Sequence, residues 1–163
     1  MTETLVIRLR TADEAPASWL IVDGAGARSG PVHSGPLDDA LSLAQGRRTV
    51  VLLPATEVTL ATPELPVRGN ARIAQAVPFA LEEQLASDLD TVHFAVGSRS
   101  GDVTPVAMVA RPVLERWQAS WDGAGIHPQA AYSESSLVPS APNACVLLLD
   151  GEALHVQRPD AVA

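Results

Sequence analysis

The chain has 163 residues, of which 47% are hydrophobic and 18% are charged, and its formal net charge is −8. This composition indicates a globular protein, and a chain of this length can bury roughly 68–70% of the surface that it exposes when unfolded. The acidic balance argues against nucleic acid as a partner, because phosphate binding needs a clustered cationic surface and the arginines occur only singly or in pairs.

In chain order, segments with alternating or continuous apolar residues predict β-strands at 4–9, 19–23, 49–53, 58–61, 92–97, 103–109, 129–132, 144–150 and 154–157. A further short strand is expected around Val32. Helical patterns lie between these strands at 37–45, from Asn70 onward and at 112–123. Residues 133–140 predict a turn or a single helical turn. Pairs of strands that alternate with helices predict an α/β fold with a mixed sheet.

Two of the predicted helices carry an apolar stripe. In the helix from Asn70, the apolar residues recur every fourth position, and they are Ile73, Val77, Leu81 and Leu85. Asn70 suits the N-cap, and Pro78 predicts either a kink or a break at which it opens a second helix. The stripe of the last helix consists of Leu114, Trp117 and Trp121, and we interpret it as core packing.

The single cysteine and the hydropathy pattern indicate the cellular compartment in which the protein works. Cys145 cannot form an internal disulfide and begins the apolar run 145–149, so we predict a buried, inert thiol in a reducing compartment. The N-terminus lacks the apolar core of a signal peptide, and no stretch approaches the ~18 apolar residues of a membrane-spanning helix. We therefore expect the chain to be soluble and cytoplasmic.

Two Asp-Gly pairs end apolar strands, at Asp23 and at Asp150. In actin-like ATPases a strand that ends in Asp-x-Gly leads into a phosphate-binding turn, so one interpretation is a nucleotide site. The other interpretation is a plain hairpin turn, for which Asp-Gly is a favoured sequence. No Walker motif, glycine-rich dinucleotide motif or metal-binding histidine spacing is present, so we predict neither a catalytic residue nor a cofactor.

The segment 69–96 also carries a family resemblance. It contains Val-Pro-Phe-Ala-Leu-Glu-Glu-Gln-Leu-Ala at 77–86, followed by Asp-Leu-Asp-Thr-Val-His-Phe-Ala at 88–95. This resembles the signature of the cytoplasmic part of the type II secretion system L component, the GspL family. The matching positions are Pro78, Phe79, Leu81, Glu82, Glu83, Leu85, His93 and Phe94. The resemblance covers most of 49–139 and extends weakly over the rest.

The resemblance implies an actin-like (ribonuclease-H-like) fold, with a mixed sheet and flanking helices. We expect one cytoplasmic region over 1–163, with two lobes at about 1–66 and 67–163. Members of the family continue into further cytoplasmic sequence, a transmembrane helix and a periplasmic domain. We therefore expect this chain to be a truncated or shortened form of such a protein.

The resemblance further implies a non-catalytic scaffold at the cytoplasmic face of the bacterial inner membrane. Such a scaffold recruits the secretion ATPase, through the N-terminal domain of that E component, and couples it to the M component. We place the ATPase contact on Glu82, Glu83, Asp88 and Asp90, because four carboxylates within nine residues create a local negative field that can steer a basic partner. The alternative interpretation is that these side chains form a solvated surface with no partner.

Two alternative functions stay open. The chain can be an actin-like nucleotide-binding ATPase that uses Asp23 and Asp150, or the related assembly protein of type IV pili. The Leu-Glu-Glu-Gln-Leu and His-Phe sequences favour the secretion family over the pilus protein. A homodimer is also compatible with the sequence.

Overall fold

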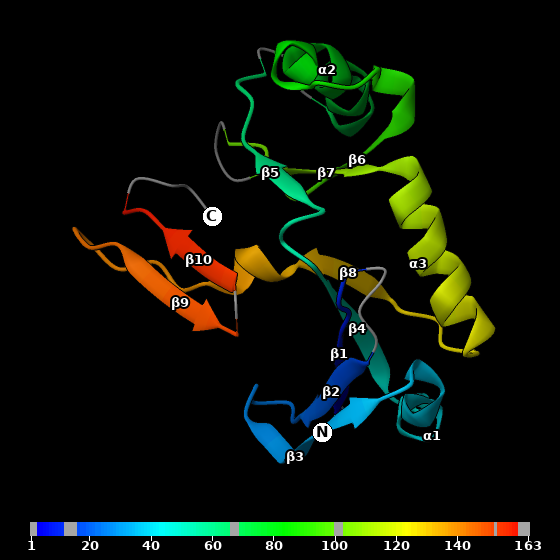
Figure 1. Cartoon of the computed structure of the whole chain (residues 1–163). Helices are drawn as coiled ribbons and strands as arrows, with labels where there is room; N and C mark the ends of the chain where they lie inside the picture. The colour runs from blue at the N-terminus through cyan, green and yellow to red at the C-terminus, as the bar shows by residue number, and fades with distance from the viewer. Residues whose placement is uncertain (1–2, 12–15, 66–68, 100–102, 152, 160–163) are drawn as a thin grey trace. The chain divides into compact units, whose positions relative to one another are not determined.

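The computed structural model of the chain describes residues 3–11, 16–65, 69–99, 103–151 and 153–159 (Figure 1). Its strands are β1 (Thr4–Arg8), β2 (Ala17–Val22), β3 (Arg28–Gly35), β4 (Arg48–Leu53), β5 (Thr59–Ala61), β6 (Val92–Val96), β7 (Val106–Ala110), β8 (Ala130–Ser133), β9 (Val146–Asp150) and β10 (Ala153–Gln157). Its α-helices are α1 (Leu41–Ala44), α2 (Asn70–Leu81) and α3 (Arg111–Gly123). Short 3-10 helices lie at η1 (Leu37–Ala40), η2 (Glu82–Gln84), η3 (Leu89–Thr91) and η4 (Glu134–Leu137). Within the described part of the chain, no helix has the length and apolar character needed to span a bilayer.

The chain divides into two compact units. Unit 1 consists of Met1–Val58 and Ala110–Ser133, and unit 2 consists of Thr59–Val109 and Glu134–Ala163. Each unit therefore combines two segments that are far apart in the sequence, whereas the sequence-based division was a single cut near residue 66.

Unit 1 is built on a five-stranded sheet with the order β3-β2-β1-β4-β8. The first three strands are antiparallel neighbours, while β1 pairs with β4, and β4 with β8, in parallel. The predicted mixed sheet is thus confirmed. Alternation along β1 has the expected result, because Leu5 and Ile7 are completely buried while Thr4, Val6 and Arg8 are half-buried.

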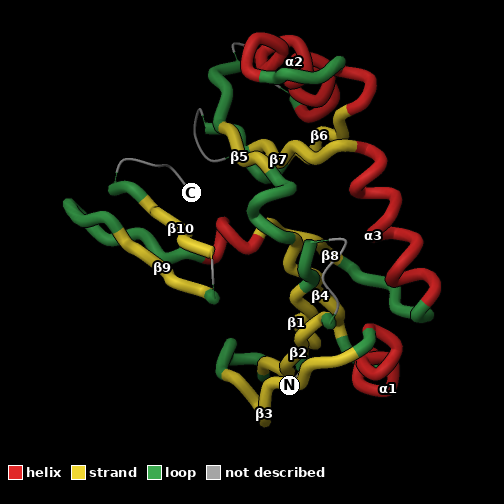
Figure 2. Tube along the Cα trace, viewed as in Figure 1, coloured by secondary structure: helices red, strands yellow, loops and turns green. Residues whose placement is uncertain are grey.

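The helices of unit 1 occupy the predicted positions. The segment expected to be helical at 37–45 forms η1 followed by α1. Helix α3 has Pro112 in its first turn, where a missing N–H costs nothing, and it ends at Gly123. Trp117 and Trp121 are 4% and 8% exposed, so the interpretation of the tryptophan stripe as core packing is confirmed. Figure 2 shows α1 near the C-terminal end of α3, where Leu41 lies against Gly125.

The first part of unit 2 places α2 against a three-stranded sheet of order β5-β7-β6. The stripe of α2 is confirmed, because Ile73, Val77 and Leu81 are at most 4% exposed. They share one buried cluster with residues of the sheet and its flanks, which are Leu65, Val92, Val106 and Met108. Leu85 packs against this cluster and is partly buried.

The predicted N-cap of α2 is wrong, and so is one of the two alternatives predicted at Pro78, the break. The N-cap is Gly69 rather than Asn70, which is the first helical residue. Gly69 has φ 93°, a backbone conformation that glycine adopts without the steric cost that asparagine would incur. Helix α2 also runs through Pro78 without a break, so Pro78 does not open a second helix.

The second part of unit 2 includes the predicted hairpin of β9 and β10, which pair antiparallel with Asp150 opposite Ala153. Asp150 is a paired strand residue, and Gly151, the first residue of the two-residue loop, has φ 58°, a conformation that glycine readily adopts there. One face of this hairpin is formed by four largely exposed side chains, here called the aliphatic face: Leu147, Leu149, Leu154 and Val156. Cys145, which precedes β9, is exposed, so the predicted buried thiol is wrong. The apolar run 145–149 belongs to a two-stranded hairpin rather than to a covered sheet, and this explains the exposure.

Candidate functional site

The four carboxylates proposed to contact a partner follow α2 directly. Glu82 and Glu83 belong to η2, Asp88 precedes η3, and Asp90 lies within η3. All four side chains are exposed. The structure therefore keeps them on one continuous surface segment, here called the acidic segment (82–90), and none is used to build the core.

Backbone hydrogen bonds hold the acidic segment in shape. The Leu85 amide donates to the Glu82 carbonyl at 3.2 Å, which closes η2. The Thr91 amide and hydroxyl both donate to the Asp88 carbonyl, at 2.9 and 2.7 Å, which closes η3. Neither short helix has a side-chain cap. Because main-chain and hydroxyl groups make these turns, the carboxylates of Glu82, Glu83 and Asp88 are not consumed in capping.

The motif residues divide into a buried set and an exposed set. Leu81 is completely buried, and Pro78, Leu85, His93 and Phe94 are partly buried. Phe79, in contrast, is 72% exposed. An exposed phenylalanine is more informative than an exposed leucine, because aromatic side chains are enriched at protein interfaces.

Phe79 lies next to the acidic segment. Glu82 and Glu83 follow Phe79 by three and four residues and lie in the short 3-10 helix η2, which begins directly after α2. The combination of one exposed ring with adjacent carboxylates suits a partner surface that is both apolar and basic.

The turn that contains Asp23 has its own explanation. The Ala25 and Ala27 amides each donate to Asp23 Oδ1 at 2.9 Å, and the Asp23 amide donates to the Ala27 carbonyl at 2.9 Å. This carboxylate oxygen therefore stabilises the turn between β2 and β3, as the plain-hairpin interpretation requires.

Asp150 is the last residue of β9 and belongs to the hairpin turn already described. The two aspartates lie in different units, Asp23 in unit 1 and Asp150 in unit 2. Among the described residues, no group of three or more His, Cys, Asp or Glu side chains is arranged to hold a metal ion.

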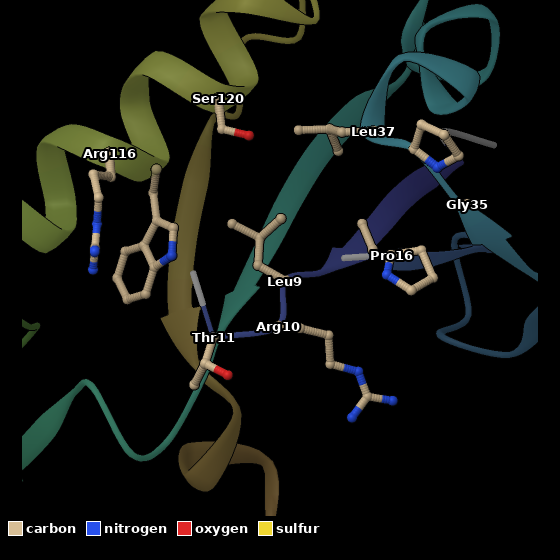
Figure 3. Close-up of a pocket in the computed structure, with 11 residues that line it drawn as sticks. Leu9, Arg10, Thr11, Pro16, Gly35, Leu37, Arg116 and Ser120 are labelled. Carbon is tan, nitrogen blue, oxygen red and sulfur yellow. The ribbon is translucent and has the colours of Figure 1, made fainter. Parts of the chain in front are cut away.

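A concave site, which the sequence did not reveal, lies within unit 1 (Figure 3). It is formed where the chain leaves β1 (Leu9, Arg10, Thr11), enters β2 and leaves β3, and it is closed by residues of α3. Antiparallel pairing explains this meeting point, because Arg8 lies opposite Ser18 and Ala17 lies opposite Gly35. The residues come from four segments, so no local motif could have predicted the site.

Comparison with known proteins identifies the kind of protein. The fold matches the cytoplasmic domain of EpsL, an inner membrane component of the type II secretion system of Vibrio cholerae, with a TM-score of 0.78 and 25% identity. The match covers 96% of this chain and 68% of that one. A type IV pilus biogenesis complex of PilM and PilN matches with a TM-score of 0.56 and 16% identity, which shows likeness of fold alone. The expected α/β fold is confirmed.

The sequence comparisons are more specific. The family model of type II secretion system protein L matches residues 5–161. Type II secretion system protein L of Klebsiella pneumoniae is 35% identical over 150 residues, and that of Dickeya chrysanthemi is 31% identical over 145 residues. These matches cover 91% and 87% of this chain but only 37% and 36% of the relatives. The chain belongs to the type II secretion system protein L family, and it spans about a third of the length of these curated relatives.

Proposed function

We propose that this chain is the part of a type II secretion L subunit that recruits the secretion ATPase at the cytoplasmic face of the inner membrane. In this proposal the chain is a non-catalytic scaffold, and it couples the ATPase to the M component of the membrane platform. Membership of the family supports a role in type II secretion. It also favours the secretion family over the pilus assembly protein, whose structure shares only the fold.

The observation that carries the choice of surface is the exposure of three of the eight signature positions. Leu81 is completely buried, so core packing explains its place in the motif. Phe79, which is 72% exposed, and the exposed Glu82 and Glu83 have no such explanation. A partner that buries the Phe79 ring and pairs cationic groups with the carboxylates would account for all three, with the ring as the main source of affinity and the charges as the source of specificity.

Titration calorimetry against the N-terminal domain of the secretion ATPase from the same organism tests this proposal. We expect saturable binding, and we expect the double variant Glu82→Arg/Glu83→Arg to weaken it by at least about tenfold, since like charges would then face a basic partner. Phe79→Ala should weaken binding by a similar factor, because buried aromatic anchors are typical hot spots.

The matched control is Asp38→Arg/Glu115→Arg, which changes the net charge equally at two exposed positions in unit 1. It should leave the affinity unchanged apart from a small, salt-dependent effect. Equal losses in the two double variants would show that only net charge matters. Unchanged affinity in the Glu82 and Glu83 variant would refute the placement of the contact on the acidic segment.

The nucleotide-binding alternative has its own test. A ligand that binds the native state must raise the melting temperature, by an amount set by its concentration relative to Kd. We expect millimolar magnesium–ATP to leave the melting temperature unchanged, because Asp23 Oδ1 already accepts two hydrogen bonds from its own turn. A magnesium-dependent rise of several degrees, abolished in Asp150→Asn, would establish the alternative instead.

A further inference from the structure

Strand β6 forms one edge of the three-stranded sheet of unit 2, on the side of β7 that faces away from β5 (Figure 1). The acidic segment leads directly into this strand, since Val92 follows η3 (Figure 2). The other end of the strand is open to solvent, because Ala95 and Val96 are both exposed. A partner that contacts the acidic segment therefore meets a strand edge that continues from it.

One hydrogen bond indicates which backbone groups of β6 point toward the outer edge. Strands β6 and β7 are neighbours joined by residues 97–105, too short a connection for a parallel crossover, so they pair antiparallel. The Gly97 amide donates to the Pro105 carbonyl at 2.8 Å, so its N–H points toward the β7 side. In antiparallel pairing, successive residues point their N–H and C=O groups alternately toward the neighbouring strand and away from it. Those of Phe94 and Val96 therefore point away from β7.

Strand β6 lacks the sequence features that usually prevent an edge strand from pairing. Natural edge strands often carry lysine or other charged side chains, proline, or a β-bulge. The sequence of β6 is Val-His-Phe-Ala-Val, without proline or a permanently charged residue. The opposite edge strand, β5, has only three residues, whereas β6 has five. Of the two edges, β6 is thus the longer, and nothing in its sequence opposes pairing.

The acidic segment indicates the chemistry of a strand that would pair there. Asp88 lies one short helical turn before β6, because the Thr91 amide donates to the Asp88 carbonyl at 2.9 Å. Its side chain is exposed, as are those of Glu82 and Glu83. Carboxylates at this end of the strand edge favour a partner with cationic groups at the corresponding position.

We propose that an extended segment of a partner protein pairs with the outer edge of β6 and places basic residues beside Asp88. Main-chain hydrogen bonds to an open sheet edge are a common mode of peptide recognition. The added strand runs antiparallel to β6, the slightly more stable arrangement, so its basic residues lie at its C-terminal end. The inference rests on the acidic segment as the partner surface, as in the proposed function, and not on the ATPase as the partner.

The direct test titrates the peptide acetyl-Val-Thr-Val-Thr-Val-Arg-Arg-amide into the chain labelled with nitrogen-15. We expect saturable shifts of the Phe94 and Val96 amides. At a peptide concentration ten times the measured Kd, solvent exchange of these amides should slow about tenfold, because only the free chain exposes them. The Gly97 amide already donates to Pro105 and should change less. This alternation distinguishes strand addition from contacts made by side chains alone.

Two matched peptides separate the backbone contribution from the charge. The peptide acetyl-Val-Thr-Pro-Thr-Val-Arg-Arg-amide keeps the charge but lacks the central N–H, and it should bind at least about fivefold more weakly. The peptide acetyl-Val-Thr-Val-Thr-Val-Glu-Glu-amide keeps the strand but reverses the charge, and it should weaken by a similar factor. If either control peptide binds as tightly as the first peptide, the proposal is wrong.

Variants of the chain test the same two roles. Val96→Pro removes an N–H that points away from β7, so it should leave the melting temperature nearly unchanged and weaken peptide binding at least about fivefold. Val96→Thr keeps this N–H and should bind within about twofold of the unaltered chain. Asp88→Arg should weaken binding at least about threefold, whereas Asp38→Arg, at an exposed position in unit 1, should not. If Val96→Pro lowers the melting temperature, amide exchange in the unaltered chain decides.

The peptide titration and the ATPase titration give separate answers. No saturable binding of the first peptide, or binding without slower exchange at Phe94 and Val96, would overturn strand addition even if the ATPase domain binds. If the peptide gives the expected pattern and the ATPase domain does not bind, strand addition is supported and the proposed function is refuted.

Discussion

Two hairpins of this chain have similar sequences but different surroundings. Strands β1 and β2 pair antiparallel around apolar residues, and so do β9 and β10. Leu5 and Ile7 of β1 are completely buried, whereas Leu147 and Leu149 of β9 are 62% and 78% exposed. The first hairpin is extended by β3 on one side and by the parallel strands β4 and β8 on the other, while the second forms a two-stranded sheet. Burial is therefore decided by the neighbours that the chain brings to a strand, and not by the strand's own hydrophobicity.

The largest effect that this comparison predicts is on core stability. Leu5→Ala should lower the free energy of unfolding by about 2–5 kcal/mol, because it removes a completely buried side chain and leaves a cavity. Leu149→Ala makes the same chemical change at an exposed position and should alter it by less than about 0.5 kcal/mol. Urea denaturation measures both. Similar losses in the two variants would mean that the aliphatic face is covered in solution.

An intermediate effect is expected at the two hairpin turns. Gly26 and Gly151 have φ of 82° and 58°, and a Cβ atom at either position would meet no atom within 4 Å, so alanine introduces backbone strain alone. This strain amounts to about 1–2 kcal/mol per residue. In Gly26→Ala it should reduce the global stability, because β2 and β3 belong to the large sheet.

In Gly151→Ala the strain should instead appear as local opening. A two-stranded hairpin is marginally stable by itself, so it can open without unfolding the rest of the chain. Amide hydrogen exchange would report faster exchange in β9 and β10 with an unchanged global unfolding transition. Loss of protection throughout unit 1 in this variant would contradict the separation of the two hairpins.

Substitutions on the aliphatic face should have the smallest effect on stability. Their main effect should be on association between copies of the chain. Contiguous exposed apolar side chains favour self-association. Leu147→Ser/Leu149→Ser should therefore reduce concentration-dependent association in sedimentation velocity, while the single exposed position in Leu60→Ser should not. A chain that stays monomeric at every concentration would show that this face does not mediate a homodimer.

Local patterns in the sequence predicted the elements well. Two periodicities each predicted a buried face that is present. They are the alternation of Leu5 and Ile7 in a strand and the recurrence of apolar residues at every fourth position in a helix, at Ile73, Val77 and Leu81. Such periodicities work because a strand or helix presents one side to the core wherever it packs. The family signature in 78–94 gave the fold class by resemblance, and the structural match confirms it.

Features that depend on distant neighbours were not predictable. Cys145 looked buried because it begins an apolar run, but no sequence pattern indicates whether another layer covers β9. The N-cap was assigned to Asn70 from side-chain preference, whereas Gly69, with its positive φ, occupies that position. Arg10 and Arg116 line one cavity only because β1 and α3 meet in unit 1.

The central claim, that the partner surface is the acidic segment with Phe79, is tested most directly by nuclear magnetic resonance. The 17.1 kDa chain, labelled with nitrogen-15, would be titrated with the unlabelled N-terminal domain of the secretion ATPase. We predict that amide shifts and line broadening concentrate in 75–91 and that unit 1 changes little. Perturbations concentrated in unit 1 or on β9 and β10, with 75–91 unaffected, would contradict the claim and place the contact elsewhere.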